Sequence, residues 1–437
     1  MINEMTNAIA SKLKSIIDSS TTLVELSVAD AYWQNKINQV VDTADPIYLL
    51  FPSTIEAVAE IVKQAAQHQW RILLCGNGSK LNWGAITKDI QLVISLQKCD
   101  RAIEHAVGDL TVTAEAGMKL ADLQALLRSH NQFLPIDSSY ADATLGGIVA
   151  TADTGSWRQR YGGVRDLLLG ISFVRADGEI AKAGGRVVKN VAGYDLMKLF
   201  TGAYGTLGVI TQLTFRTYPL ITTSQTILLT GQAPQIAQAS QSIRNSGLTP
   251  VALDLLSSPL VSSLNLGSGI GLIMRWQTIP ESINQQLEQV QAIANQLNLT
   301  TYKFQEQAEI DLWHNCANLT TKTNSETAVS CKMGIAPQGA VDFLQLEQVN
   351  KNQVAARIHA SSGIGQLRLD SANSQIIEFM RSHCQQNQGF LTILDAPKTL
   401  KQQVDIWGYS GNALKTMQAI KNQFDPQNIF NPNRFIV

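Results

Sequence analysis

Residues 75–84 of this chain read CGNGSKLNWG. The preceding residues, 71–75, are typical of a β-strand, so Gly76, Gly78 and the hydroxyl of Ser79 directly follow a strand end. Successive backbone N–H groups in such a turn can form a concave site for an anion such as a pyrophosphate. The alternative is an ordinary turn at the end of a strand, which is the commoner explanation for an isolated pair of glycines.

Two familiar phosphate-binding motifs are excluded at this loop. A Rossmann fingerprint needs a third glycine at position 81, where Leu81 stands, and then a long helix. A Walker A loop needs a Gly-Lys dipeptide, which occurs nowhere in the sequence. Any phosphate site at 75–84 is therefore of another kind.

Two further segments are rich in glycine and other small residues. Residues 144–155 read TLGGIVATADTG, and residues 202–211 read GAYGTLGVIT. Small side chains let the backbone approach a flat or phosphate-bearing ligand closely. Close packing of a helix against a sheet explains the same composition, so both explanations stay open.

Composition narrows the function classes. The chain has 437 residues with 34 basic and 35 acidic side chains, a net charge of −1, and 45% hydrophobic residues. Only 16% of its residues are charged, against an average of about 25%. Without a field of one sign, nucleic acid and anionic membranes are poor partners. No apolar run approaches the ~18 residues of a membrane span.

The cysteines and histidines exclude several metal and nucleophile chemistries. No two of the five cysteines are closer than fifteen residues, which excludes zinc ribbons and iron–sulfur loops. An odd count without a signal peptide favours free thiols in a reducing cytoplasm. The six histidines form no H-E-x-x-H pattern, and there is no G-x-S-x-G elbow. His359 lies on a predicted strand, where a lone histidine is more often structural than catalytic. Three arginines (Arg275, Arg357 and Arg368) also lie on predicted strands and could meet a carboxylate, although solvation or structural pairing is the commoner explanation for each.

Hydrophobic periodicity predicts an α+β chain. In the first half it predicts helices over 1–20, 55–66 and 120–127, the second beginning with a capping box of Ser53 and Glu56. It predicts strands over 45–51, 71–75, 92–96, 111–116, 168–175 and 209–218, with a hairpin turn at Asp177-Gly178. From about residue 221, glycine becomes rarer and amide side chains more frequent. There the pattern predicts strands over 226–229, 270–276, 328–335, 353–360 and 366–369, and helices over 283–293 and 414–424.

Together, and in this order, these segments resemble the vanillyl-alcohol oxidase (PCMH-type FAD-binding) superfamily of flavoproteins. The matching stretches are 51–58, 75–84, 134–139, 146–147, 205–211 and 424–434. Within the superfamily, GGVRD at 162–166 and VKNVAGYDL at 188–196 resemble the E subunit of glycolate oxidase.

The resemblance implies an α+β fold: a PCMH-type FAD-binding domain of two subdomains, with an α+β cap. The implied division is an N-terminal helical segment at 1–44, the FAD-binding domain at 45–220, the cap at 221–400 and a return to the FAD domain at 401–437. It also implies these cofactor-binding residues: Cys75, Gly76, Asn77, Gly78, Ser79, Lys80, Ser138, Ser139, Thr144, Leu145, Gly146, Gly147, Ala150, Thr151, Gly155, Gly208, Val209 and Ile210. The loop amides would hold the pyrophosphate, the Gly146 segment would line the flavin and ribityl path, and Val209 and Ile210 would lie near the adenine.

Departures from the superfamily pattern refine these expectations. Many relatives tether the flavin through a histidine near the loop, and none lies between residues 69 and 104 here, so we expect non-covalent FAD. At the C-terminus the Asn-Pro-Gly of relatives is replaced by Asn431-Pro432-Asn433, and asparagine tolerates a positive φ. Catalytic relatives carry a His-x-Gly-Asp-Gly-Asn-x-His motif for a metal and a base. The stretch here, HASSGIG at 359–365, keeps only the first histidine, so His359 is the one candidate catalytic residue and no metal is expected.

The implied function is that of an FAD-binding subunit of glycolate dehydrogenase, which oxidises glycolate to glyoxylate. The implied partners are a catalytic FAD subunit, an iron–sulfur subunit and a small 2-hydroxy acid. The expected location is the cytoplasm, either free or attached to a membrane through partner subunits. Two alternatives stay open: a non-catalytic flavin scaffold or electron relay, and a stand-alone oxidase of another alcohol. The neutral, amide-rich surface of 221–400 is a candidate contact face, because the cores of interfaces are depleted in charge.

Overall fold

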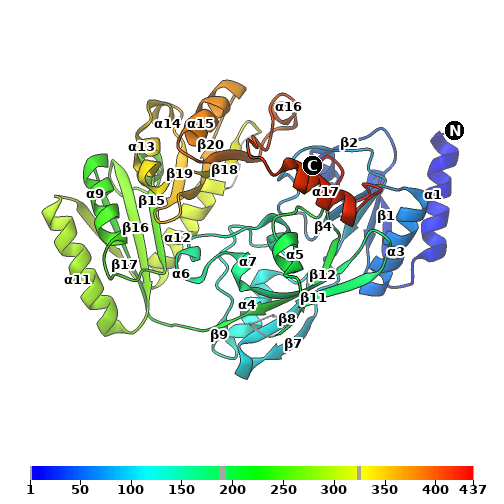
Figure 1. Cartoon of the computed structure of the whole chain (residues 1–437), viewed down its shortest axis with the longest axis horizontal. Helices are drawn as coiled ribbons and strands as arrows, with labels where there is room; N and C mark the ends of the chain where they lie inside the picture. The colour runs from blue at the N-terminus through cyan, green and yellow to red at the C-terminus, as the bar shows by residue number, and fades with distance from the viewer. Residues whose placement is uncertain (1, 187–192, 322–325, 437) are drawn as a thin grey trace. The chain divides into compact units, whose positions relative to one another are not determined.

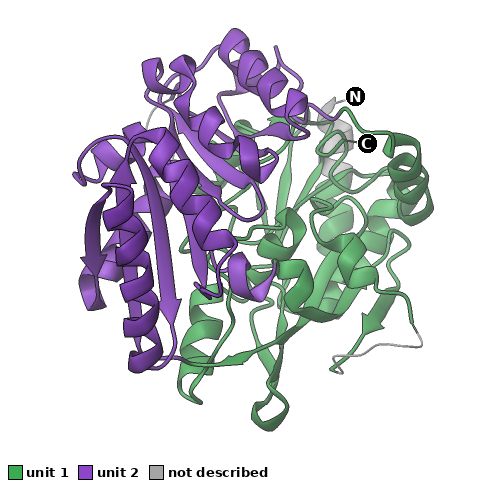
Figure 2. Cartoon of the chain, turned by 60° about the vertical axis from the view of Figure 1, so that its left-hand side comes forward, with its two compact units in different colours: residues 1–154, 163–220, 410–437 green, residues 155–162, 221–409 purple. Residues whose placement is uncertain are grey.

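A computed structural model describes residues 2–186, 193–321 and 326–436. The chain divides into two compact units (Figure 2). Unit 1 comprises Met1–Thr154, Gly163–Leu220 and Ser410–Val437, and unit 2 comprises Gly155–Gly162 and Ile221–Tyr409. In the described part of the chain, no helix is both long enough and apolar enough to cross a membrane.

The first sheet of unit 1 has the strand order β1-β3-β6-β4, and its two outer strands, β1 and β4, are labelled in Figure 1. Its strands are β1 (Thr22–Glu25), β3 (Tyr48–Phe51), β6 (Leu92–Ser95) and β4 (Ile72–Cys75). β3, β6 and β4 run parallel, and β1 is antiparallel to β3. The helix α3 (Ile55–His68) connects β3 to β4 and buries one apolar stripe of five side chains. The predicted strands at this sheet are confirmed, and β4 delivers the chain directly into the loop at 76–80.

The predicted capping box at the start of α3 is wrong. The N-cap residue is Thr54, whose hydroxyl oxygen accepts a hydrogen bond from the N–H of Ala57 at 3.2 Å. Thr54 has extended backbone angles and lies directly before the first helical residue, Ile55. It therefore takes the capping role that the sequence pattern assigned to Ser53 one residue earlier.

The second sheet of unit 1 is antiparallel, in the order β11-β10-β12-β8-β7. Its strands are β7 (Ala102–Ala106), β8 (Thr111–Glu115), β10 (Leu168–Val174), β11 (Ile180–Gly184) and β12 (Val209–Arg216). The predicted hairpin turn is confirmed: Gly178 has a φ of 85° and its N–H donates to the Arg175 carbonyl at 3.0 Å. β7 was not expected.

The remaining elements of unit 1 are short strands and the helices around the two sheets. The strand pairs are β2 (Val41–Asp42) with β5 (Thr87–Lys88), and β9 (Gln132–Phe133) with β13 (Tyr218–Pro219). The helices are α1 (Ile2–Ile16), α2 (Ala31–Asn38), α4 (Leu120–Arg128), α5 (Leu145–Thr151), α7 (Val164–Leu167), α8 (Leu196–Phe200) and α17 (Leu414–Phe424).

Unit 2 is built on one antiparallel sheet with the order β17-β14-β16-β15-β19-β20-β18-β21. Its strands are β14 (Ser224–Gly231), β15 (Ala252–Leu256), β16 (Ile270–Gln277), β17 (Thr300–Phe304), β18 (Val329–Gly334), β19 (Ala355–His359), β20 (Ile364–Leu369) and β21 (Phe390–Asp395). Its helices are α6 (Arg158–Tyr161), α9 (Ala233–Arg244), α10 (Ser258–Ser263), α11 (Pro280–Gln296), α12 (Glu306–Thr321), α13 (Ala340–Gln345), α14 (Glu347–Lys351), α15 (Ser374–Gln386) and α16 (Lys398–Lys401). Leu312 and Cys316 of α12 pack into a buried apolar cluster with Leu228 and Ile273 of the sheet.

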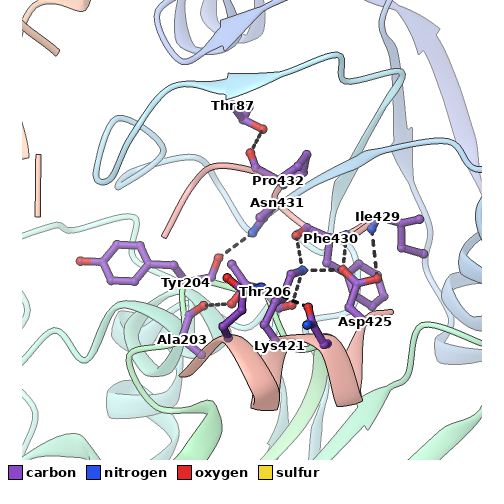
Figure 3. A network of polar contacts seen from close by, with 12 residues as sticks. Thr87, Ala203, Tyr204, Thr206, Lys421, Asp425, Ile429, Phe430, Asn431 and Pro432 are labelled. Carbon is purple, nitrogen blue, oxygen red and sulfur yellow. Dashed lines mark hydrogen bonds and ion pairs between the residues drawn. The ribbon is translucent and has the colours of Figure 1, made fainter. Parts of the chain in front are cut away.

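The end of the chain folds back into unit 1 through a buried ion pair (Figure 3). Lys421 Nζ lies 2.5 Å from Asp425 Oδ2, and both side chains are almost fully buried. Lys421 also donates to the carbonyls of Thr206 and Phe430, and Asp425 accepts the N–H groups of Ile429 and Phe430. Burial lowers the pKa of Lys421, and the charge of Asp425 opposes that shift. The pair therefore satisfies the polar groups of the turn after α17.

The residues after this turn complete the open edge of the parallel sheet. Ile72 of β4 donates to the Ile429 carbonyl at 2.7 Å, and Asn431 donates to the Ile72 carbonyl at 2.9 Å. An exposed edge strand offers unpaired backbone groups that need covering, and the C-terminal segment covers those of β4. Asn433 stands where relatives have glycine, and its φ of 61° is a left-handed conformation that asparagine tolerates.

Replacing Lys421 with methionine should lower the free energy of unfolding by about 3–5 kcal/mol, because Asp425 would stay buried without its cation. Urea unfolding followed by circular dichroism measures the change. The matched control is Lys351→Met, since Lys351 forms an i, i+4 pair with Glu347 whose side chains are 66% and 71% exposed. That control should cost no more than about 1 kcal/mol. Equal losses in the two variants would contradict the role given to the buried pair.

Candidate functional site

Unit 1 contains a cavity beside the glycine-rich loop. The cavity brings together most of the residues expected from the sequence: Cys75, Gly76, Asn77, Gly78, Ser79, Lys80, Thr144, Gly146, Gly147, Ala150, Thr151, Gly208, Val209 and Ile210.

The loop after β4 presents unused backbone donors. Among the described residues, the N–H groups of Asn77, Gly78 and Ser79 make no hydrogen bond, and neither does the Ser79 hydroxyl. The carbonyl groups of the loop are occupied: Gly76 O accepts from Ser95 Oγ at 2.9 Å and Asn77 O from Tyr32 Oη at 2.6 Å. Backbone N–H groups left open at a cavity wall suit an anionic ligand.

The two loop glycines are required for different reasons. A Cβ atom on Gly76 would lie 2.1 Å from Thr144 Oγ1, so this residue must be glycine for the loop to pack against the start of α5. Gly78 has a φ of 72°, a conformation that residues with a side chain rarely adopt. Both glycines therefore allow the backbone conformation and the packing of the loop that lines the cavity.

The segment at 144–151 forms the opposite part of the lining as helix α5. Thr144 caps this helix by accepting from the N–H of Gly147 at 3.3 Å. A Cβ atom on Gly146 would lie 2.8 Å from the Cβ of Ala116. Gly146 thus allows close packing and also lines the cavity, so packing is confirmed and contact with a ligand stays a prediction.

A buried ion pair stands at the edge of the loop. Lys80 Nζ lies 3.1 Å from Asp153 Oδ2, and each side chain is 4% exposed. Ser138 Oγ donates to the same carboxylate oxygen at 2.6 Å, and the Lys80 ammonium lies over the rings of Trp83 and Tyr140. Lys80 therefore has its counter-ion within the protein. Ser138 contacts the carboxylate of Asp153 and does not itself line the cavity.

Four expected site residues are not among those that line this cavity. They are Ser138, Ser139, Leu145 and Gly155. Leu145 is fully buried in the core, and Gly155 belongs to unit 2.

Eight lining residues were not expected: Leu74, Leu81, Leu96, Ala116, Tyr204, Gly205, Asn431 and Arg434. Gly205, Asn431 and Arg434 lie in stretches that carried the resemblance, but no place at the cofactor site was expected for these three residues. Of the motif expected at 188–196, residues 188–192 lie outside the described residues.

His359 is held in a buried polar cluster of unit 2. Its Nδ1 lies 2.6 Å from Asp254 Oδ1, while Ser156 Oγ donates to the other oxygen and Arg357 Nε lies 4.0 Å from it. Burial opposes ionisation of Asp254, but the neighbouring His359 and Arg357 outweigh it and lower the pKa of the carboxyl group. One ring nitrogen of His359 is thereby committed to a structural partner.

The arginines of the second-unit strands also have carboxylate partners. Arg275 pairs with the buried Glu309 at 3.0 Å, and Arg368 pairs with Asp370 at 2.7 Å. Glu309 accepts in addition from Ser224 and Thr226. These contacts support structural pairing for both residues.

Known proteins match both the sequence and the fold. Residues 46–184 match the family model described as FAD binding domain. The chain is 26% identical over 432 residues to glycolate oxidase subunit GlcD of Bacillus subtilis, covering 89% of this chain and 88% of that protein. It is 32% identical over 208 residues to D-lactate dehydrogenase of Archaeoglobus fulgidus, covering 47% of each.

Among solved structures, p-cresol methylhydroxylase with substrate bound aligns with a TM-score of 0.73 over 98% of this chain and 96% of that chain, at 15% identity. This likeness confirms the expected PCMH-type fold. The family match at 46–184 and the relatives identify the chain as an FAD-dependent oxidoreductase that carries an FAD binding domain.

Proposed function

We propose that the chain is the FAD-binding subunit of a glycolate dehydrogenase, and that the cavity of unit 1 holds the cofactor. The observation that carries this proposal is the row of open N–H donors at 77–79 in a loop that lines the cavity. In this proposal unit 1 supplies the FAD-binding domain, including 1–44 and 410–437, and 221–409 supplies the cap, since residues 401–409, expected with the C-terminal return, belong to unit 2.

The residues of unit 1 fit FAD in their chemistry. The loop amides would bind the diphosphate, the Gly146 and Gly147 backbone would allow close approach of the ribityl chain and flavin ring, and Val209 and Ile210 would give an apolar wall for the adenine. The bound flavin supplies a hydride acceptor, while the protein contributes orientation and electrostatics. Since no histidine lines the cavity, we infer that FAD is held without a covalent bond.

A 2-hydroxy acid is the proposed substrate class, on the strength of the relatives. Glycolate oxidase and D-lactate dehydrogenase are both named for acids with a hydroxyl group next to the carboxylate. Glycolate is proposed because of the 26% identity to glycolate oxidase subunit GlcD together with the stretches GGVRD at 162–166 and VKNVAGYDL at 188–196, which resemble a glycolate oxidase subunit. Oxidation to glyoxylate would pass the electrons to an iron–sulfur subunit, and the amide-rich surface of 221–400 is the proposed contact face.

A second candidate function is a flavin-bearing relay that supports a catalytic paralogue. The stretch that begins at His359 favours it, because it lacks the acid and the second histidine of the catalytic motif.

Anaerobic spectroscopy of the purified chain separates these functions. If the chain oxidises glycolate by itself, adding glycolate should bleach the flavin absorption, and a dye should be reduced in steady state. D-Lactate and D-2-hydroxyglutarate, added in parallel, define the specificity. A chain whose flavin is reduced only when partner subunits are present supports the relay. Peroxide formation in air without partners would instead indicate a stand-alone oxidase and contradict the subunit proposal.

Alanine at Gly76 should abolish flavin retention, because its Cβ would displace Thr144 and deform the donor loop. The FAD-to-protein ratio of the purified variant measures the effect. Gly108→Ala is the matched control, since Gly108 is in the same unit and a Cβ there meets nothing within 4 Å. Retention of a full complement of FAD by the Gly76 variant would argue against the loop as the phosphate site.

A further inference from the structure

Two buried cationic side chains line the cavity, and they differ in one respect. Lys80 is paired with Asp153, so its charge is already compensated by the protein. Arg434, 4% exposed, has no carboxylate within ion-pair distance among the described residues. Its contacts are with neutral carbonyl groups: Nη2 donates to Leu81 O, and Nη1 donates to Ala85 O at 3.4 Å.

The guanidinium of Arg434 also has spare hydrogen-bonding capacity. Arginine carries five N–H donors, and the two contacts with Leu81 and Ala85 are the only hydrogen bonds that its side chain makes to the described residues. Because Arg434 borders the cavity, a ligand there can reach the remaining donors. A guanidinium suits phosphate oxygens well, since its planar fork can bind two of them at once.

The acidic groups nearest to Arg434 do not supply a counter-ion. Burial raises the pKa of the Cys75 thiol to about 12, so the sulfur stays protonated at neutral pH. Burial also raises the pKa of the Tyr204 phenol above its ordinary value. Arg434 itself remains charged, because desolvation lowers its pKa only to about 10. An unpaired buried cation costs several kcal/mol, which an anion in the cavity would offset.

We propose that Arg434, from the C-terminal segment, binds the diphosphate of FAD, an inference that rests on the proposed function of the cavity. The chain holds Arg434 in place from both sides. Its N–H donates to Asn431 O at 3.1 Å, and its carbonyl accepts from the N–H of Ala85 at 3.2 Å. The residue thus belongs to the same hydrogen-bonded assembly as the loop whose amides face the cavity, although the two are more than 340 residues apart in sequence.

In the alternative, purely structural role, Arg434 would only hydrogen-bond the carbonyl groups of Leu81 and Ala85 and would make no contact with a ligand. Flavin binding to the apoprotein, followed by fluorescence, separates the two roles when FAD and riboflavin are compared. The two ligands share the isoalloxazine ring, and only FAD has the diphosphate. The variants are Arg434→Gln and Arg434→Lys. Arg175→Gln is the matched control, since Arg175 is 54% exposed, pairs with Asp177 and does not line the cavity.

We expect Arg434→Gln to weaken FAD binding by about tenfold to a hundredfold, the loss typical of a charged hydrogen bond. Riboflavin binding should change by less than about threefold, and the control should match the wild type with both ligands. Arg434→Lys, which keeps the charge without the planar fork, should lose part of the FAD affinity and leave riboflavin binding unchanged.

Unchanged FAD affinity in Arg434→Gln, or equal losses for FAD and riboflavin, would overturn the proposal in favour of the structural role. If the glutamine variant does not fold, the lysine variant decides, and an unaltered ratio of FAD to riboflavin affinity counts against the proposal. A wild-type chain that binds no FAD refutes instead the proposed function on which the inference rests.

Discussion

One amide side chain joins two segments that line the cavity of unit 1. Asn431 Oδ1 accepts the N–H of Leu74 at 2.8 Å, and Nδ2 donates to the Tyr204 carbonyl at 2.6 Å (Figure 3). Leu74 is the penultimate residue of β4, which leads into the donor loop, while Tyr204 belongs to the turn before β12. The C-terminal segment therefore fixes the distance between two parts of unit 1 that come from different sheets.

The remaining C-terminal contacts support this bridge. The buried Lys421–Asp425 pair organises the turn that precedes it, and the pairing of Ile72 with the segment closes the edge of β4. Since a buried polar group is costly unless it is hydrogen-bonded, each of these contacts favours one arrangement of the segment. A chain that leaves unit 1 at residue 220 and returns at 410 depends on such contacts to rejoin its own sheet.

The sequence was informative wherever a local rule applies. The predicted strands, the hairpin at Gly178 and the last helix follow from periodicity and glycine positions, and the structure has them, with strand bounds that differ from the expected ones by up to three residues. The cap of α3 was misplaced by one residue, because Ser53 and Thr54 are both able to cap and only backbone geometry selects between them. The expectation that the chain binds FAD came from the superfamily resemblance and not from periodicity.

Contacts between distant segments could not be predicted in the same way. The composition of 144–151 is compatible with both packing and ligand contact, and its role depends on what lies opposite, which is Ala116 and Gly76. Asn431 and Arg434 stood in a recognised C-terminal motif, yet nothing local indicates that they meet a loop more than 340 residues earlier. Likewise, the partner of His359, Asp254, follows only from the pairing of β15 with β19.

The flavin content of the purified chain tests most directly whether this cavity is an FAD site. The protein should be yellow, with flavin absorption bands, and acid precipitation should release about one FAD per chain into the supernatant. A colourless protein that does not take up FAD on titration would contradict the assignment. Flavin that stays with the acid precipitate would contradict the non-covalent mode of binding.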